Sequence, residues 1–166
     1  MKNFWKNRRG LVTGANGFLA GWVSKRLIER GAVLTALIYE KNHFSVFEVD
    51  KLREKSRVIY SDVLDFNSMK RILRDHKIQT VFHLGAQAIC KTAIADPVAT
   101  LDANIRGTIN VLEAVRIVNP KIELVIASSD KAYGTHEELP YYEHFPLRGE
   151  YPYEVSKSCA DLISQM

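Results

Sequence analysis

A glycine-rich turn between a predicted strand and a predicted helix decides the fold; it reads Leu11-Val12-Thr13-Gly14-Ala15-Asn16-Gly17-Phe18-Leu19. Gly14 permits a tight turn, Gly17 lets the backbone approach a pyrophosphate, and Ala20 stands where a third glycine would allow close packing of the helix on the strand. The free N–H groups at the helix start and their partial positive charge favour phosphate. The turn therefore predicts a dinucleotide site, and the alternative is a plain strand–helix turn without a ligand.

Outward from this turn, short β-branched runs alternate with longer runs of helical period. Strands are expected at 11–13, 33–39, 57–60, 80–84 and 122–127. Helices are expected at 18–30, within 44–52, around 69–73, over 97–118, and around 153–157 after a turn-rich stretch at 134–152. This alternation predicts an α/β fold, a Rossmann-like doubly wound parallel sheet in a three-layer αβα arrangement. One NAD(P)-binding domain is expected over residues 1–166.

Composition limits the classes of protein that fit the chain. Its 166 residues are 46% hydrophobic and 25% charged, which is ordinary for a globular domain. The net charge is +4 and the basic residues are spread along the chain, so we expect no nucleic-acid partner. No apolar run is long enough for a membrane span, and the basic N-terminus lacks the apolar stretch of a signal peptide, so a cytoplasmic protein is expected. Cys90 and Cys159 lack metal-ligand spacing, and no metal is expected.

Polar and small residues follow the predicted strands where a dinucleotide would lie, at the carboxyl edge of a parallel sheet. Glu40 can accept hydrogen bonds from the adenosine ribose, although Lys41 beside it could hold a 2′-phosphate, which leaves NADP open beside NAD. Asp62 can accept from the adenine amino group, and Asn104 lies in the long helix. Glu40 and Asn104 also have ordinary interpretations, as a solvated loop charge and a polar helix position. The expected cofactor-binding residues are Gly14, Asn16, Gly17, Phe18, Leu19, Glu40, Asp62, Val63, Leu84, Gly85, Ala86, Gln87, Asn104, Tyr153 and Lys157.

A second cluster of reactive groups follows the fifth predicted strand: Ser128-Ser129-Asp130-Lys131-Ala132-Tyr133-Gly134, and then Tyr153-x-x-x-Lys157. The spacing of four places Tyr153 and Lys157 on one helix face. A hydroxyl, a carboxylic acid, an ammonium and a tyrosine/lysine pair suit removal of a hydride from a sugar alcohol and then of water. Alone, such a tyrosine/lysine pair is common on ordinary helices, and Asp130-Lys131 could form a surface ion pair.

Several motifs occur in the order found in one known family: Thr13-Gly14-x-x-Gly17, Asp62-Val63, His83-Leu84-Gly85-Ala86-Gln87, Asn104-x-x-Gly107-Thr108-x-Asn110-Val111-Leu112-Glu113-Ala114, Ser128-Ser129-Asp130-Lys131-Ala132-Tyr133-Gly134 and Tyr153-x-x-x-Lys157. The chain resembles the extended short-chain dehydrogenase/reductases, in the NAD-dependent epimerase/dehydratase family, over essentially its whole length. Within that family, Ser128-Ser129-Asp130-Lys131 and the opening Phe4-Trp5-Lys6 are most similar to the CDP-glucose 4,6-dehydratases.

The resemblance implies an NAD-dependent nucleotide-sugar 4,6-dehydratase, a lyase, acting on CDP-glucose or a related nucleotide-diphosphate hexose. Tyr153 would take the proton of the sugar 4-hydroxyl as hydride passes from carbon 4 to NAD, and Ser129 would bond the 4-oxygen. Lys157 would stabilise the ionised tyrosine and hold the nicotinamide ribose. Asp130 would protonate the departing 6-hydroxyl, and Lys131, if buried, would be the base at carbon 5 or an electrostatic stabiliser. Hydride return to carbon 6 then gives a 4-keto-6-deoxy sugar.

Members of this family are considerably longer and carry a C-terminal substrate domain, so the chain is expected to be the N-terminal portion, with that domain absent. Two other functions stay open: a non-catalytic NAD-binding module, and a nucleotide-sugar 4-epimerase or reductase. Asp130 argues against the second, because epimerisation expels no water. In relatives the helices corresponding to 97–118 and 153–166 pair across a dimer. A homodimer is therefore expected, with an apolar stripe at Ile105, Ile109, Leu112 and Val115.

Overall fold

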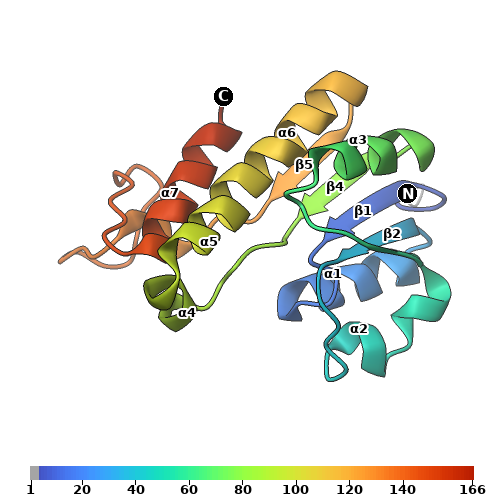
Figure 1. Cartoon of the computed structure of the whole chain (residues 1–166), viewed down its shortest axis with the longest axis horizontal. Coiled ribbons are helices and arrows are strands. Elements are labelled where there is room, and N and C mark those ends of the chain that lie inside the picture. The colour runs from blue at the N-terminus through green and yellow to red at the C-terminus, as the bar shows by residue number, and fades with distance from the viewer. Residues whose placement is uncertain (1–3) are drawn as a thin grey trace.

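Five parallel strands form the centre of the molecule in the order β3-β2-β1-β4-β5. A computed structural model describes residues 4–166; the first three residues of the domain expected over 1–166 lie outside the described part. The strands are β1 (Arg9–Thr13), β2 (Val33–Ile38), β3 (Arg57–Tyr60), β4 (Thr80–His83) and β5 (Glu123–Ile126). Every neighbouring pair is parallel. The predicted Rossmann-like doubly wound sheet is therefore confirmed (Figure 1).

Helices cover both faces of the sheet. Helices α1 (Phe18–Glu29) and α2 (Val46–Val49) and the 3-10 helix η1 (Leu52–Lys55) lie on one face, and α3 (Phe66–Asp75) and α6 (Gly107–Val118) lie on the other. Side chains alternate along β1, so that Leu11 enters the core under α3 and α6 while Val12 enters the core under α1. One core lies on each face of the sheet, so the molecule has the three layers, helix–sheet–helix, that the strand and helix pattern predicts.

The expected helix over 97–118 is one continuous run with a wider turn in its middle. It consists of α5 (Pro97–Leu101), a π-helical segment η2 (Asp102–Arg106) and α6, with right-handed helical dihedrals through both junctions. Asp96 caps its start, because the carboxylate accepts a hydrogen bond from the Ala99 N–H at 3.0 Å. The periodicity of the sequence does not reveal the π segment, because one extra residue per turn leaves most apolar positions in place.

Two short helices differ from the sequence expectation. The helix expected within 44–52 ends at Val49, because Lys51 has φ +52°, and η1 follows it. Helix α4 (Cys90–Ala95) was not expected at all. Its N-cap residue, Ile89, offers no side-chain oxygen, so the sequence lacks the usual signal of a helix start.

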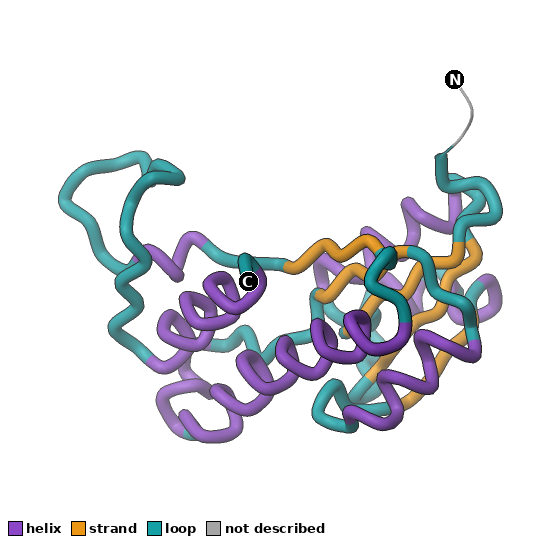
Figure 2. The backbone as a smooth tube through the Cα atoms, turned by 90° about the horizontal axis from the view of Figure 1, so that it is seen from above, coloured by secondary structure: helices purple, strands orange, loops and turns teal. Residues whose placement is uncertain are grey.

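Helix α7 (Pro152–Ser164) lies beside the sheet rather than on it. It packs against α4, α5, η2 and α6, and against the 3-10 helix η3 (Asp130–Tyr133) that follows β5. The stretch 134–151 projects beyond α7, at the end of the molecule away from the strands (Figure 2). The reactive segment after β5 therefore lies at one end of an elongated molecule, next to α7 (Figure 1).

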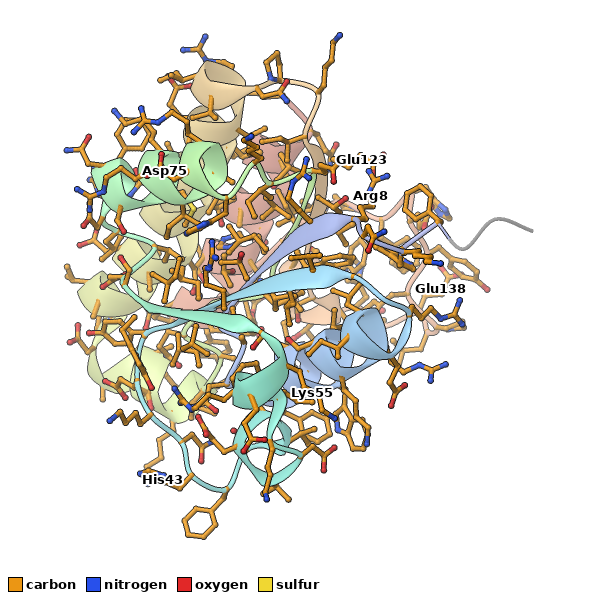
Figure 3. The ribbon with its side chains drawn as sticks, turned by 90° about the vertical axis from the view of Figure 1, so that its right-hand side faces the viewer. Arg8, His43, Lys55, Asp75, Glu123 and Glu138 are labelled. Carbon is orange, nitrogen blue, oxygen red and sulfur yellow. The ribbon has the colours of Figure 1, made fainter. Side chains whose placement is uncertain are left out.

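At the opposite edge of the sheet, where the strands begin, Arg8 joins three strands through an ion pair and a hydrogen bond. Arg8 contacts the Glu123 carboxylate at 2.6 Å and donates to the Thr80 hydroxyl at 2.7 Å (Figure 3). These bonds tie the start of β1 to the starts of β4 and β5.

Within residues 4–166, no helix has the length and apolar character needed to cross a membrane.

Candidate active site

The glycine turn after β1 and the glycine after β4 meet at the centre of the sheet. From β1 the chain continues toward β2 and β3, whereas β4 and β5 lie on the other side of it, so the crevice between β1 and β4 is the topological switch point. Gly14 has φ +65°, and a Cβ atom there would lie 2.7 Å from the Gly85 Cα. The predicted tight turn at Gly14 is confirmed, and it is backed by backbone-to-backbone packing that only two glycines allow.

The start of α1 is an open cradle for an anion. Gly17 is its N-cap residue, no side chain caps the first turn, and no acidic residue lies in that turn. The first N–H groups of a helix lack partners within the helix, and their dipoles favour negative charge. Phe18 and Leu19 are 85% and 56% exposed, which leaves this end of the helix accessible. These residues fit a pyrophosphate.

Close approach in this region involves Gly21 rather than Ala20. Ala20 is buried in the core, as expected for a small residue facing the sheet. A Cβ on Gly21 would lie 3.2 Å from the Val46 Cβ, so this glycine sets the contact between α1 and α2. The sequence order Ala20-Gly21 therefore moves the tight contact from the strand to a neighbouring helix and leaves the turn intact.

Asn16 braces the turn with its side chain. Its amide donates to the Glu40 carbonyl at 3.0 Å and accepts from the Ser45 hydroxyl. Glu40 itself is exposed at the end of β2, and the Lys41 ammonium lies 5.8 Å from the Tyr60 ring. Asn16 thus holds the end of β2 close to the turn, and the Ser45 hydroxyl supports the Asn16 side chain. The sequence did not indicate Ser45, because it lies in the ambiguous segment after β2.

The end of β3 is fixed by a local turn and by α6. Asp62 accepts from the Leu64 N–H at 2.9 Å through one carboxylate oxygen. Asn110 donates to the carbonyls of Val63 and Leu64, both at 3.0 Å. Asp62 and Val63 therefore lie at the carboxyl edge of the sheet, beside the strand ends that carry Gly14 and Glu40.

Asn104 joins the end of β4 to helix α7. It is 2% exposed; its Oδ1 accepts from the Gln87 N–H at 2.8 Å, and its Nδ2 donates to the Gln87 carbonyl and to the Ser156 hydroxyl. Gln87 uses its side chain to hold Thr100 and Ile89. Asn104 is therefore no ordinary polar helix position. Ser156 was missed by the sequence analysis, although it lies within the Tyr153-x-x-x-Lys157 motif.

Helix α7 is docked on the segment after β5 by two buried side chains. The Lys157 ammonium donates to the Ala127 carbonyl at 2.6 Å, and the Ser158 hydroxyl donates to the Ala132 carbonyl at 2.7 Å. Burial lowers the pKa of Lys157, and the charge of Asp161 opposes that shift. Tyr153 is partly buried, and its hydroxyl has no hydrogen-bond partner within residues 4–166. The tyrosine is thus available to a ligand, next to a lysine that is held in place.

Ser129, Asp130 and Lys131 form the first turn of η3. The Ser129 hydroxyl accepts from the Lys131 N–H and contacts the Asp130 carboxylate, both at 3.2 Å. Asp130 and Lys131 are exposed, and within the described residues they form no ion pair with each other. The condition under which Lys131 was expected to act as a base, its burial, is therefore not met.

The cavity beside Ser129 measures about 630 Å³, which is large enough for a sugar. Its lining comes from η3, the stretch 134–151 and α7: Ser128, Ser129, Asp130, Tyr133, Glu143, Phe145, Leu147, Asp161, Leu162 and Gln165. Tyr153 and Lys157 do not line it; they reach the same segment from the other side, through Ala127. Glu143 and Phe145 could not be found from sequence, because the turn-rich stretch has no periodicity.

No group of three or more histidine, cysteine, aspartate and glutamate side chains within residues 4–166 is arranged to hold a metal ion. Cys90 and Cys159 are free thiols; Cys90 is exposed and Cys159 partly buried.

Comparison with known proteins identifies relatives over almost the whole chain. The family described as GDP-mannose 4,6 dehydratase matches residues 11–166. CDP-glucose 4,6-dehydratase of Salmonella typhimurium is 33% identical over 165 residues, which are 98% of this chain and 46% of that protein. GDP-mannose 4,6-dehydratase of Yersinia enterocolitica is 26% identical over 166 residues, 95% of this chain and 45% of that protein.

Among solved structures, UDP-glucose 4-epimerase from Bifidobacterium longum, in complex with NAD+ and UDP, superposes with a TM-score of 0.84 at 26% identity. The match covers 95% of this chain and 48% of that one. The chain thus spans about half the length of the curated relatives and solved structures that it matches.

Proposed function

This chain belongs to the GDP-mannose 4,6-dehydratase family, and we propose that it forms the NAD-binding half of a nucleotide-sugar 4,6-dehydratase. The family expected from the motifs is confirmed. CDP-glucose, or a related nucleotide-diphosphate hexose, is the substrate we propose, on the similarity to the Salmonella typhimurium protein. The observation that carries the proposal is the docking of α7, with Tyr153 and Lys157, on the segment that bears Ser129 and Asp130.

We propose NAD as the cofactor, as hydride acceptor from sugar carbon 4 and donor to carbon 6. The uncapped start of α1 and the crevice at Gly14 and Gly85 would hold its pyrophosphate. Glu40, exposed at the end of β2, would accept from the adenosine ribose, and Asp62 would face the adenine. The direction of Lys41 toward the Tyr60 ring favours NAD over NADP, because that ammonium is then drawn away from a 2′-phosphate.

In the first step we assign proton removal to Tyr153. Its free hydroxyl would take the proton of the sugar 4-hydroxyl, while Ser129 would bond the same oxygen. Tyrosine ionises near pH 10 in water, so it needs a cation nearby at neutral pH. Lys157, buried and held by the Ala127 carbonyl, would supply that charge and bond the nicotinamide ribose.

In the second step we assign the loss of water to groups at the cavity. Asp130, exposed beside Ser129, would protonate the departing 6-hydroxyl. A base must take the carbon 5 proton, which the 4-keto group makes acidic. We assign this role to the Glu143 carboxylate, which lines the same cavity as Asp130. Lys131 is exposed and is not part of that lining, so we keep it only as an electrostatic stabiliser.

A 4-epimerase is the second candidate, because a UDP-glucose 4-epimerase shares this fold at 26% identity. The carboxylate of Asp130 in the cavity beside Ser129 favours the dehydratase. The substrate domain expected from the family would lie in the part of the relatives' length that this chain does not span, and we propose that it supplies the remaining wall of the sugar-nucleotide site.

We also propose a homodimer through α5, α6 and α7. Val98, Ile109 and Leu162 on these helices are 68%, 42% and 58% exposed. The stripe expected from the sequence is only partly outward, because Val115 is 4% exposed and belongs to the core. Sedimentation of the wild type and of an Ile109→Glu variant tests this: the variant should be monomeric, and two identical profiles at the monomer mass would contradict it.

The test of function is turnover. The protein is combined with the C-terminal part that its relatives carry beyond this chain and is incubated with NAD and CDP-glucose, and the alkaline absorbance of a 4-keto sugar is measured. We expect product from the wild type and none from Tyr153→Phe, which should still bind NAD. Bound NAD without product in the wild type would support the non-catalytic module instead.

A further inference from the structure

A series of buried polar side chains links β1, β4 and α6 at the switch point. It begins with Thr13 at the end of β1, passes through His83 at the end of β4, and reaches Thr108 in α6; these residues are 0%, 4% and 3% exposed. The Thr13 Oγ1 lies 2.8 Å from the His83 Nδ1, and the His83 Nε2 lies 3.2 Å from the Thr108 Oγ1. Both imidazole nitrogens are therefore engaged.

The partners of Thr13 decide which nitrogen carries the proton. The Thr13 oxygen already accepts from the Leu84 N–H at 3.1 Å and the Gly85 N–H at 2.9 Å. A hydroxyl oxygen has two lone pairs and one proton, so Thr13 has only its proton left to offer. It must donate to Nδ1, and the imidazole proton must then lie on Nε2, from which it is donated to Thr108.

The chain continues from Thr108 to the helix that carries the tyrosine. The Thr108 hydroxyl donates to the Asn104 carbonyl at 2.6 Å, in the π segment. The Asn104 amide donates to the Ser156 hydroxyl at 2.8 Å, and Ser156 donates to the Tyr153 carbonyl at 2.6 Å. An unbroken series of hydrogen bonds thus joins the glycine turn to α7.

We propose that His83 is a positioning residue: as the Nε2–H tautomer it couples the turn that begins at Thr13 to helix α7, so that cofactor binding and the placement of Tyr153 depend on each other. The cofactor part of this statement rests on the proposed function. A histidine suits this place because its neutral imidazole accepts at one nitrogen and donates at the other, on opposite sides of a rigid ring.

The imidazole must stay neutral for this role. Burial lowers the pKa of His83 to about 4, and the positive charge of Lys157, from α7, acts in the same direction. A protonated imidazole would turn Nδ1 into a donor facing Thr13, whose two lone pairs are already used. Neutral pH therefore leaves the series intact.

The first test reads the tautomer directly. The protein is labelled with ¹⁵N histidine, and the imidazole nitrogen shifts are recorded between about pH 5 and 8, a range that brackets the ordinary histidine pKa. We expect His83 to keep a protonated Nε2 and a bare Nδ1 throughout. A proton on Nδ1, or titration near the ordinary value, would overturn the proposal. This measurement needs no cofactor.

The second test measures coupling. Thr108→Val removes the partner of Nε2 and the donor to the Asn104 carbonyl with little change in side-chain shape, and we expect about tenfold weaker NAD binding. Thr35→Val is the matched control, a buried threonine in β2 outside the series, and it should bind NAD as the wild type does. Equal affinities for both variants would overturn the proposal. A wild type that fails to bind NAD would refute the proposed function and leave the tautomer result standing.

Discussion

The two halves of the site are built differently. At the glycine turn, the parts that would hold a cofactor are backbone groups and buried polar side chains, such as Gly14 against Gly85 and Thr13 against His83. At η3, the groups that would act on a sugar are exposed, as Asp130 and Lys131 show. In the first region, the same residues would bind the cofactor and stabilise the fold. In the second region, the reactive side chains are exposed and contribute little to the stability of the fold. Substitutions in the first should lower stability, and substitutions in the second should lower activity alone.

The largest effect is expected at Gly14. Gly14→Ala places a Cβ 2.7 Å from the Gly85 Cα at a φ of +65°, so backbone must move. We expect a loss of about 4 kcal/mol of unfolding free energy, measured by chemical denaturation, and loss of NAD binding.

Gly10→Ala, in the strand β1 that precedes the turn, is its control. A Cβ there would meet only the Thr80 carbonyl, at 3.9 Å, so the variant should be as stable as the wild type within about 0.5 kcal/mol. If Gly14→Ala were equally harmless, the rigid packing that we ascribe to the glycine turn would be wrong.

The next effect is a loss of stability in acid through His83. Its pKa is about 4 in the folded protein against 6.5 as the ordinary value, so the unfolded chain binds more protons between these values. The stabilisation is present above pH 6.5 and is lost as the pH falls toward 4. This amounts to about 3 kcal/mol between the two ends. Urea denaturation at several pH values should show a flatter profile for His83→Asn than for the wild type; parallel profiles would contradict the burial of a neutral imidazole.

Lys157 lies where the two regions meet. Burial lowers the pKa of Lys157, because it disfavours the charged form in the folded protein. The unfolded chain therefore binds more protons, and the unfolding free energy should rise as the pH approaches the ordinary lysine value of 10.5 from below. Lys157→Met removes the buried charge but also the hydrogen bond to the Ala127 carbonyl, so we expect this pH dependence to disappear while the unfolding free energy at neutral pH stays within about 1 kcal/mol of the wild type. The same change should reduce turnover by about 100-fold.

Lys91→Met, an exposed position on α4, is the control for Lys157→Met and should change neither quantity. A Lys157→Met variant that is less stable but fully active would show that the lysine serves the fold instead of the reaction.

The smallest effect on stability is expected at Asp130. Its side chain is exposed and contacts only the neighbouring Ser129 hydroxyl, so Asp130→Asn should shift the unfolding free energy by less than about 0.5 kcal/mol. Release of water should nevertheless stop, while oxidation at carbon 4 continues and NADH accumulates in single-turnover absorbance at the reduced-cofactor band. Wild-type product formation by this variant would remove Asp130 from the mechanism.

The same division explains what the sequence could predict. The succession of strands and helices, the tight turn at Gly14 and the helix that carries Tyr153 follow from local pattern, because glycine spacing and apolar periodicity report on the backbone. The helix α4 and the π segment escaped, since neither has a capping or periodic signal. The sequence left the burial of Lys131 open and did not reveal Glu143 or Ser156, because exposure and long-range contacts depend on how η3, the stretch 134–151 and α7 pack together.

The most direct measurement follows a label through the reaction. CDP-glucose carrying deuterium at carbon 4 is incubated with NAD, the protein and the C-terminal part that its relatives carry beyond this chain, and the position of the label in the product is read by NMR. A 4,6-dehydratase moves the hydride from carbon 4 to carbon 6, so we predict deuterium at carbon 6 of a 4-keto-6-deoxy sugar. Deuterium that returns to carbon 4 of an epimerised sugar, or a substrate that is recovered unchanged, would contradict the dehydratase.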